Sequence, residues 1–130
     1  MDIRVLEEYG INYKSGLERF LGDVELYEMV LDAFLKDTTL EKAKNALEEK
    51  DYKQLFEFIH QLKGSSGSSD MIELYNASCK LVELLRNDVY DEERIYECFF
   101  EVESSYIRTK EGITKARKVH DNEQRNNTSC

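Results

Sequence analysis

The chain contains no proline, and its apolar residues recur at spacings of three and four in several long runs. Proline breaks helices, whereas the Leu, Glu, Lys and Ala in which this chain is rich favour them. Residues three and four apart share one face of a helix, so each of these runs predicts an amphipathic helix. The sequence therefore predicts an all-α protein and gives little support to strands.

At 130 residues, the chain suits a single domain with one hydrophobic core. Short helical segments are predicted near the N-terminus, and long helices joined by short turns follow them. Short turns place consecutive helices as antiparallel neighbours, which predicts an up-down-up-down four-helix bundle. The predicted domain spans residues 1–118, and the polar segment 119–130 is expected to be a disordered tail.

Capping signals locate the helix boundaries. A capping box from Ser15 to Glu18 predicts the start of a brief helix. The residues predicted to cap the long helices are Asp23, Asp51, Asp70 and Asp91. A second capping box, from Thr38 to Glu41, leaves open whether the first long helix, predicted over residues 24–47, is interrupted there.

The second long helix carries a histidine opposite its apolar face. At about 100° per residue, the residues that fall on the apolar face are Leu55, Phe58, Ile59 and Leu62. The neighbours of His60 on the outer face, at spacings of three, four and seven, are Phe56, Glu57, Lys63, Gly64 and Gly67. The imidazole is therefore expected to face solvent, beside a cation and bare backbone.

Two glycines follow this histidine at helical spacing. Gly64 and Gly67 would each cost a helix about 1 kcal/mol relative to alanine, so their positions need a reason. One interpretation is clearance, which would let a second protein bring a reactive group onto His60. The other is that the helix ends at Gly64 and that Gly-Ser-Ser-Gly-Ser-Ser forms a flexible loop. Periodicity does not decide between the two.

The segment His60 to Gly67 reads His-Gln-Leu-Lys-Gly-Ser-Ser-Gly. It resembles the signature of histidine-containing phosphotransfer (HPt) domains of bacterial type, and an upstream segment, from Gly10 to Tyr27, resembles their entry segment. The resemblance implies one continuous helix through the histidine segment and one long helix over residues 24–47. Many members carry glycine and alanine ten and eleven residues after the histidine. This chain has Asp70 and Met71 there, which puts the end of the histidine helix in doubt.

The resemblance implies a phosphorelay intermediate. His60 would accept a phosphoryl group from a receiver-domain aspartate and pass it to another receiver domain, so the chain would be a phosphocarrier and not a turnover enzyme. Lys63, one turn from His60, would stabilise the charge on the phosphoryl oxygens. Gly64 and Gly67 would provide clearance.

Three further residues are candidates for contact with the partner. Tyr52 and Phe56 lie toward the same outer side as the histidine, and Gln61 flanks it. Exposed aromatic side chains are typical of docking patches, although both aromatics could equally be ordinary boundary residues, and Gln61 could be solvated.

The expected partners are response-regulator receiver domains and a hybrid sensor histidine kinase. No metal-binding or phosphate-binding motif is recognisable, so no cofactor is expected on this chain, and the resemblance assigns Mg²⁺ to the partner receiver domain. The net charge of −9 argues against a nucleic-acid partner. No apolar run approaches the roughly 18 residues of a membrane span, and three cysteines form no paired motif. These features predict a cytoplasmic protein, and we expect it to be a monomer.

Two other interpretations fit parts of the sequence. Glu57 and His60 have the spacing of di-iron helical bundles, but that motif must occur twice, and the other histidine, His120, lies in the tail. An HPt-like bundle could instead dock receiver or kinase domains as a scaffold or inhibitor without carrying phosphate. Such proteins usually lack the histidine, so His60, Lys63 and Gly64 together favour the carrier.

Overall fold

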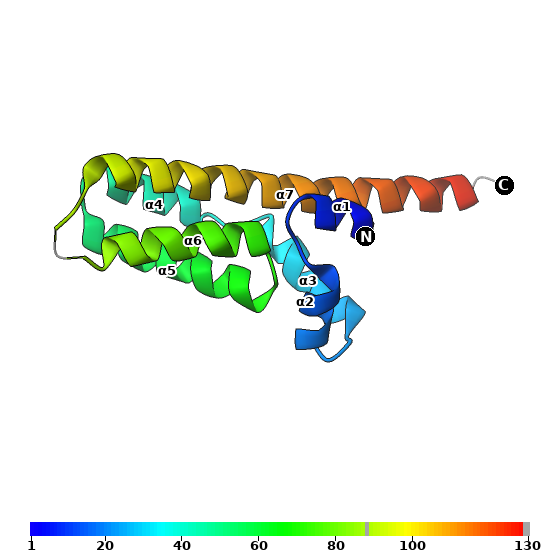
Figure 1. The fold of residues 1–130 in the computed structure, drawn as a ribbon. Helices are drawn as coiled ribbons and strands as arrows, with labels where there is room; N and C mark the ends of the chain where they lie inside the picture. The colour runs from blue at the N-terminus through cyan, green and yellow to red at the C-terminus, as the bar shows by residue number, and fades with distance from the viewer. Residues whose placement is uncertain (88, 129–130) are drawn as a thin grey trace.

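The computed structural model describes residues 1–87 and 89–128, with side chains described as far as Lys118. The helices of this part of the chain (Figure 1) are α1 (Ile3–Glu8), α2 (Tyr13–Arg19), α3 (Val24–Phe34), α4 (Thr39–Glu48), α5 (Tyr52–Ser68), α6 (Ile72–Leu85) and α7 (Glu92–Thr128). Within the described residues, the extended structure is one isolated backbone bridge between Ile11 and Met71. The prediction of an all-α protein is confirmed.

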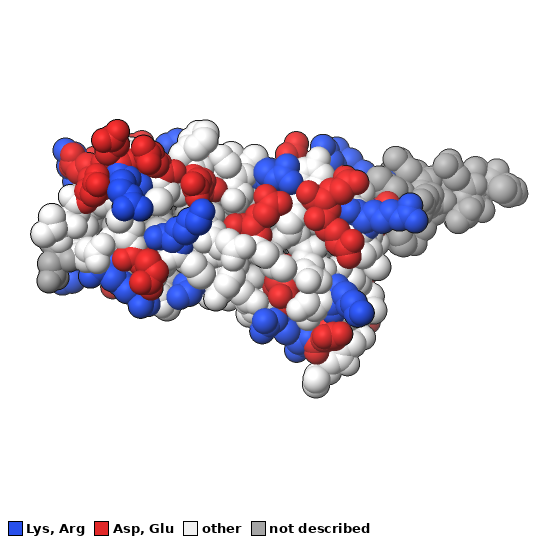
Figure 2. All heavy atoms as spheres, in the orientation of Figure 1, with Lys and Arg blue, Asp and Glu red and all other residues white. Residues whose placement is uncertain are grey.

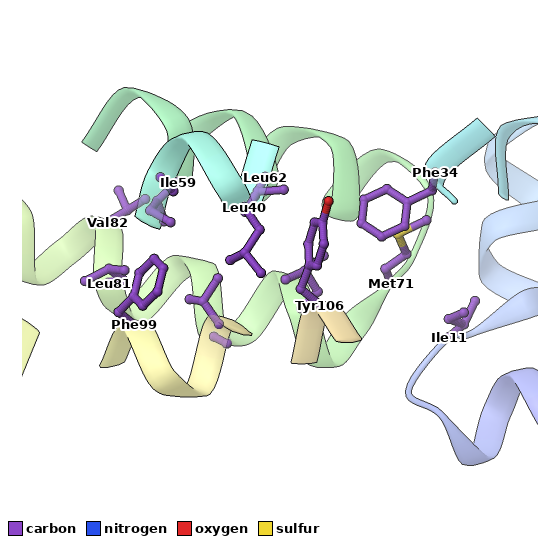
Figure 3. Packing of buried hydrophobic residues seen from close by; sticks show 14 of the residues in the cluster. Ile11, Phe34, Leu40, Ile59, Leu62, Met71, Leu81, Val82, Phe99 and Tyr106 are labelled. Carbon is purple, nitrogen blue, oxygen red and sulfur yellow. The ribbon is translucent and has the colours of Figure 1, made fainter. Parts of the chain in front are cut away.

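The later helices pack against one another, and buried side chains of the N-terminal segments join the same core. Helix α5 packs against α4 and α6, and α6 packs against α7, while α1 lies along α7. Figure 1 shows α2 and α3 beyond the end of α5 and α6 at which the turn between those two helices lies. Buried side chains from successive helices meet in one cluster (Figure 3), which includes Leu40 of α4, Leu62 of α5, Leu81 of α6 and Phe99 of α7.

Three of the predicted caps are present. The carboxylates of Asp23, Asp51 and Asp91 accept hydrogen bonds from the backbone N–H groups three residues further on, at 3.0, 3.2 and 3.3 Å. These bonds satisfy N–H groups that have no partner inside the helix, and they fix the starts of α3, α5 and α7.

None of the described helices combines the length and the apolar character that a membrane span requires.

Helix α2 begins earlier than the capping box predicts. Its first residue is Tyr13, and the Asn12 side chain accepts a hydrogen bond from the N–H of Ser15 at 3.1 Å. Asparagine is as good a cap as serine, so the earlier candidate is the one used, and Ser15 lies inside the helix.

The first predicted long helix is two helices, so the expectation of one continuous helix is wrong. Residues 35–38 separate α3 from α4. There the Asp37 carboxylate accepts hydrogen bonds from the N–H and the hydroxyl of Thr39, at 2.9 and 3.0 Å. The backbone carbonyl of Asp37 accepts from the Tyr106 hydroxyl and the Lys110 ammonium group of α7, both at 2.6 Å. Side chains of α7 thus satisfy the carbonyl that the break leaves open.

Asp70 does not cap α6, contrary to the prediction. Its φ of 55° lies in the left-handed region, and its carboxylate accepts a hydrogen bond from Nε of Arg19 at 2.7 Å. Met71 is the N-cap residue of α6, and the carbonyl of Gly10 accepts the N–H of Glu73 at 3.3 Å. The N-terminal segment therefore supplies the acceptor that a capping side chain would otherwise provide.

Helix α7 extends beyond the apolar pattern that predicts it. Ile113 and Ala116 are both 0% exposed. The N-terminal segment covers this part of the helix, where the N–H of Asp2 donates to the carbonyl of Ala116 at 3.1 Å. The backbone is helical to Thr128, through most of the segment 119–130 that we expected to be a disordered tail. Residues 129–130 lie outside the described part of the chain.

We expect the chain to lose stability at alkaline pH through its buried tyrosines. The hydroxyl of the fully buried Tyr27 donates to the carbonyl of Ser69 at 2.7 Å. Burial, with a smaller effect of nearby Asp70, raises the pKa of Tyr27 well above its ordinary value. Burial and the hydrogen bond with Asp37 raise the pKa of Tyr106 in the same direction.

The folded phenols keep their protons while unfolded tyrosine titrates near pH 10, so the free energy of unfolding should fall as pH rises through about 10. Each such group should account for about 1.4 kcal/mol near pH 11. Urea denaturation followed by circular dichroism at several pH values measures this loss. Tyr27→Phe should show a shallower decline than the native chain, and parallel curves would contradict the assignment.

Candidate functional site

His60 lies on the outer face of α5. Leu55, Ile59 and Leu62 of this helix are fully buried, whereas His60 is exposed. The ring of the half-buried Phe56 lies beside the imidazole, with 5.8 Å between the ring centroids. The helical periodicity therefore placed this histidine correctly.

Helix α5 continues through both glycines and ends at Ser68, so the alternative of a flexible loop after Gly64 is wrong. The serine hydroxyls of this segment bond to the preceding turn of the same helix. Ser66, for example, donates to the carbonyl of Leu62 at 2.5 Å. Such bonds satisfy the hydroxyls without interrupting the helix.

A groove of about 650 Å³ runs beside His60. Its walls come from α5, the α5–α6 turn, the beginning of α6 and the end of α2. The lining residues of α5 include His60, Lys63, Gly64 and Gly67, and those from the other elements include Arg19, Asp70, Ile72 and Tyr75. The candidate nucleophile, the candidate phosphate-binding lysine and both glycines therefore share one concave surface.

Lys63 and Gly64 leave this surface open. Lys63 is half-buried, and no carboxylate in the described part of the chain lies within 4.0 Å of its ammonium group. A Cβ atom added at Gly64 would meet nothing within 4 Å. Packing inside this chain does not require glycine at that position, so the free space above it is available to another molecule.

Gly67 has a different surrounding. A Cβ atom at this position would lie 3.1 Å from Cε2 of Tyr75, which is closer than ordinary contact. The space beside Gly67 is therefore occupied by the Tyr75 ring, and this glycine lets α6 approach α5. The neighbouring Cys79 raises the pKa of the Tyr75 phenol above its ordinary value.

The predicted partner-binding residues do not form one cluster. Gln61 is exposed on α5 next to His60, and Phe56 touches the histidine while packing against the core. Tyr52 lies eight residues before His60, about 12 Å along the helix. Its hydroxyl donates to Glu92 at 3.1 Å and its ring lies 4.7 Å from that of Tyr90, so it joins α5 to the beginning of α7.

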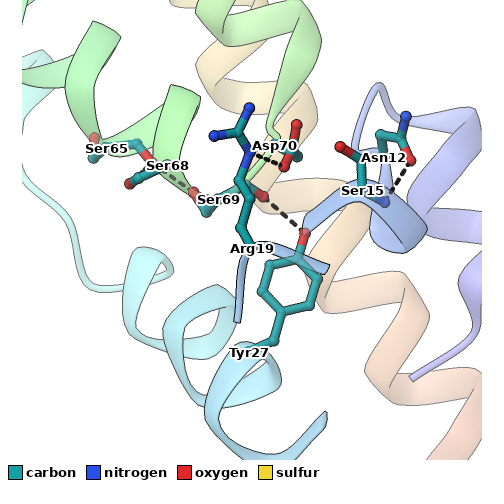
Figure 4. A network of polar contacts seen from close by, with 8 residues as sticks. All are labelled: Asn12, Ser15, Arg19, Tyr27, Ser65, Ser68, Ser69 and Asp70. Carbon is teal, nitrogen blue, oxygen red and sulfur yellow. Dashed lines mark hydrogen bonds and ion pairs between the residues drawn. The ribbon is translucent and has the colours of Figure 1, made fainter. Parts of the chain in front are cut away.

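Arg19 is a groove residue that the sequence analysis did not select. It lies at the end of α2, and its Nε–H donates to the Asp70 carboxylate at 2.7 Å (Figure 4). The residue belongs to the upstream segment that resembles the HPt entry segment. That was the available signal, but nothing in the local pattern places its side chain beside the histidine helix.

The surface charge is mixed. Figure 2 shows basic and acidic side chains interspersed over the described part of one face, with acidic side chains gathered over the first turns of α7, where Glu92 and Glu93 lie. A broad basic area, which nucleic-acid binding would need, is not seen among the residues drawn on that face. Among the described side chains, no three His, Cys, Asp or Glu residues gather as ligands for a metal ion.

The family model of the Hpt domain matches residues 25–111, two thirds of the chain. No curated protein and no solved structure matches the chain. The extent of the family match shows that the chain belongs to the Hpt domain family. Hpt domains are phosphocarriers in two-component signalling, and they interact with receiver domains and kinases. The matched region contains His60 and most of the groove but begins after Arg19.

Alanine substitutions should separate the two glycines. Gly64→Ala should raise the free energy of unfolding by up to about 1 kcal/mol, because alanine favours an exposed helix position. Gly67→Ala should be at least about 1 kcal/mol less stable than Gly64→Ala, because the added methyl group displaces Tyr75. Chemical denaturation of both variants provides the measurement. Equal stabilities of the two variants would show that the Tyr75 ring does not require glycine at position 67.

Proposed function

We propose that this chain is a phosphorelay intermediate that accepts a phosphoryl group on His60 from a receiver-domain aspartate and passes it to another receiver domain. The observation that supports this most directly is the exposed imidazole on a rigid helix, beside open space at Gly64. Phosphoryl transfer depends mainly on positioning and on charge stabilisation, and an exposed nucleophile on a fixed scaffold provides the positioning.

The proposed step is an in-line displacement at phosphorus. A ring nitrogen of neutral His60 uses its lone pair to form the N–P bond, while the bond between phosphorus and the aspartyl oxygen breaks and the aspartate leaves as a carboxylate. The reverse displacement, by the aspartate of a second receiver, regenerates the free imidazole. The expected Mg²⁺ belongs to the receiver domain and would neutralise charge on the phosphoryl oxygens during transfer.

Lys63 is the residue of this chain that we expect to stabilise the phosphoryl group. It lies one turn beyond His60, it lines the same groove, and no described carboxylate neutralises it. An ammonium group in that position offers charge-assisted hydrogen bonds to peripheral oxygens. The receiver would dock over the outer face of α5, with Phe56 and Gln61 at its edge and α4 to α7 as the up-down-up-down scaffold beneath.

His60→Gln should abolish phosphorylation. The native chain, incubated with Mg²⁺ and phosphorylated receiver domains from the same cell, should acquire label that is labile to acid and stable to base. Glutamine keeps a similar volume and polarity on an exposed position but lacks the nucleophilic nitrogen, so the variant should fold normally and remain unlabelled. Binding of receivers without transfer to the native chain would instead support a docking module, and label retained by His60→Gln would place the acceptor elsewhere.

Lys63→Ala should slow the transfer by about tenfold, which corresponds to about 1.4 kcal/mol in the barrier. The rate of label uptake from a phosphorylated receiver in rapid-quench experiments gives the comparison. Lys42→Ala is a matched control, because Lys42 is exposed on α4 and lies outside the groove. Equal rates for the two variants would remove Lys63 from the proposed mechanism.

A further inference from the structure

We infer that Arg19 is a partner-recognition residue, whose guanidinium group pairs with a carboxylate of the docked receiver domain beside the α5–α6 turn. This inference depends on the proposed function, because it assigns a specificity contact to the same docking event. The residue lies outside the part of the chain that matches the family model, residues 25–111.

The guanidinium group of Arg19 is held in place by one hydrogen bond and keeps further donors for a partner. Its Nε–H donates to Asp70 at 2.7 Å, while the side chain remains 58% exposed. Figure 4 shows the guanidinium group bound to Asp70 through Nε. Within the described residues, the two terminal nitrogens of Arg19 make no hydrogen bond. A guanidinium fork tethered through one edge can still bind a carboxylate through the other.

The anchor of Arg19 is rigid. The Asp70 side chain is only 10% exposed, and the Asp70 carbonyl accepts the N–H of Asn12 at 2.9 Å. The adjacent carbonyl, of Ser69, accepts the Tyr27 hydroxyl. Because Arg19 is already ordered before a partner arrives, less side-chain entropy is lost on binding than for a free surface arginine.

The anchor of Arg19 lies beyond the end of the histidine helix. From His60 to the end of α5 at Ser68, the helix advances about 12 Å. Arg19 is tethered beyond that end, at Asp70, so we assign it to the partner surface. Lys63, one turn from the histidine, remains the candidate for contact with the phosphoryl group.

The chemistry of the groove indicates what it would receive. Its charged side chains are Arg19, Lys63 and Asp70, which sum to +1 on a chain whose net charge is −9. Ile72 and Tyr75, which are 38% and 37% exposed, also line the groove and offer apolar surface. The complementary occupant is a receiver segment with an apolar side chain for this surface and a carboxylate for Arg19. A carboxylate at this position complements the local positive charge.

A purely structural function for Arg19 makes a different prediction. If Arg19 served only to tether α2 to the α5–α6 turn, removal of either partner of the Arg19–Asp70 pair should weaken receiver binding equally. If Arg19 contacts the receiver, loss of its charge should weaken binding, whereas loss of the Asp70 charge should not. Arg19→Gln and Asp70→Asn are suitable variants, because each amide can keep a hydrogen bond to the remaining partner.

The experiment measures the dissociation constant of a beryllofluoride-activated receiver domain by fluorescence anisotropy at low and high salt. The receiver is one from the same cell that phosphorylates the native chain. Arg19→Gln should weaken binding about tenfold and should reduce its salt dependence. Asp70→Asn should bind within about twofold of the native chain, or more tightly. Lys14→Ala, which removes a charge from an exposed position on α2 outside the groove, should bind as the native chain does.

Equal affinity of Arg19→Gln and the native chain would overturn the inference while leaving the phosphocarrier function intact, since the native chain would still bind and transfer. Equal weakening of Arg19→Gln and Asp70→Asn would also overturn it, in favour of the tether. Failure of the native chain to bind or exchange phosphate with any receiver would overturn the proposed function and this inference together.

Discussion

The turn between α5 and α6 is the point on which the site depends. Three contacts from the N-terminal segment converge on it: the Tyr27 hydroxyl on the Ser69 carbonyl, the Arg19 guanidinium group on the Asp70 carboxylate, and the backbone bridge between Ile11 and Met71. A buried polar group that loses its partner costs about 1–3 kcal/mol. Separation of α2 and α3 from this turn would therefore lower the free energy of unfolding. One wall of the groove beside the histidine helix therefore depends on contacts made at a distance from the histidine.

At His60, packing fixes one face of α5 and the opposite face is open to a partner. The inner face of α5 is fully buried at Ile59 and Leu62, which fixes the axis and rotation of the helix. The outer face carries the imidazole, with free space over Gly64. A nucleophile presented in this way needs little from its own chain besides position and one nearby cation, because the partner supplies the remaining charge stabilisation.

Much of the fold could be predicted because helices follow local rules. Apolar spacing and acidic caps located α5, and the same signals gave the start of α3 at Asp23. The break between α3 and α4 could not be found in this way. It depends on Tyr106 and Lys110, which reach Asp37 from α7 across about seventy residues of sequence. The cap predicted at Asp70 failed for a similar reason, because a carbonyl from the N-terminal segment satisfies the first turn of α6.

By itself the sequence determined the helical class, the exposed position of His60 and its neighbourhood with Lys63 and Gly64, because these follow from the repeat of a single helix. The tertiary structure alone decided that Gly67 accommodates the ring of Tyr75 and that Arg19 lines the same groove as His60. Both depend on how separate helices approach one another. Side-chain packing between elements sets that approach, and the periodicity of one element does not contain it.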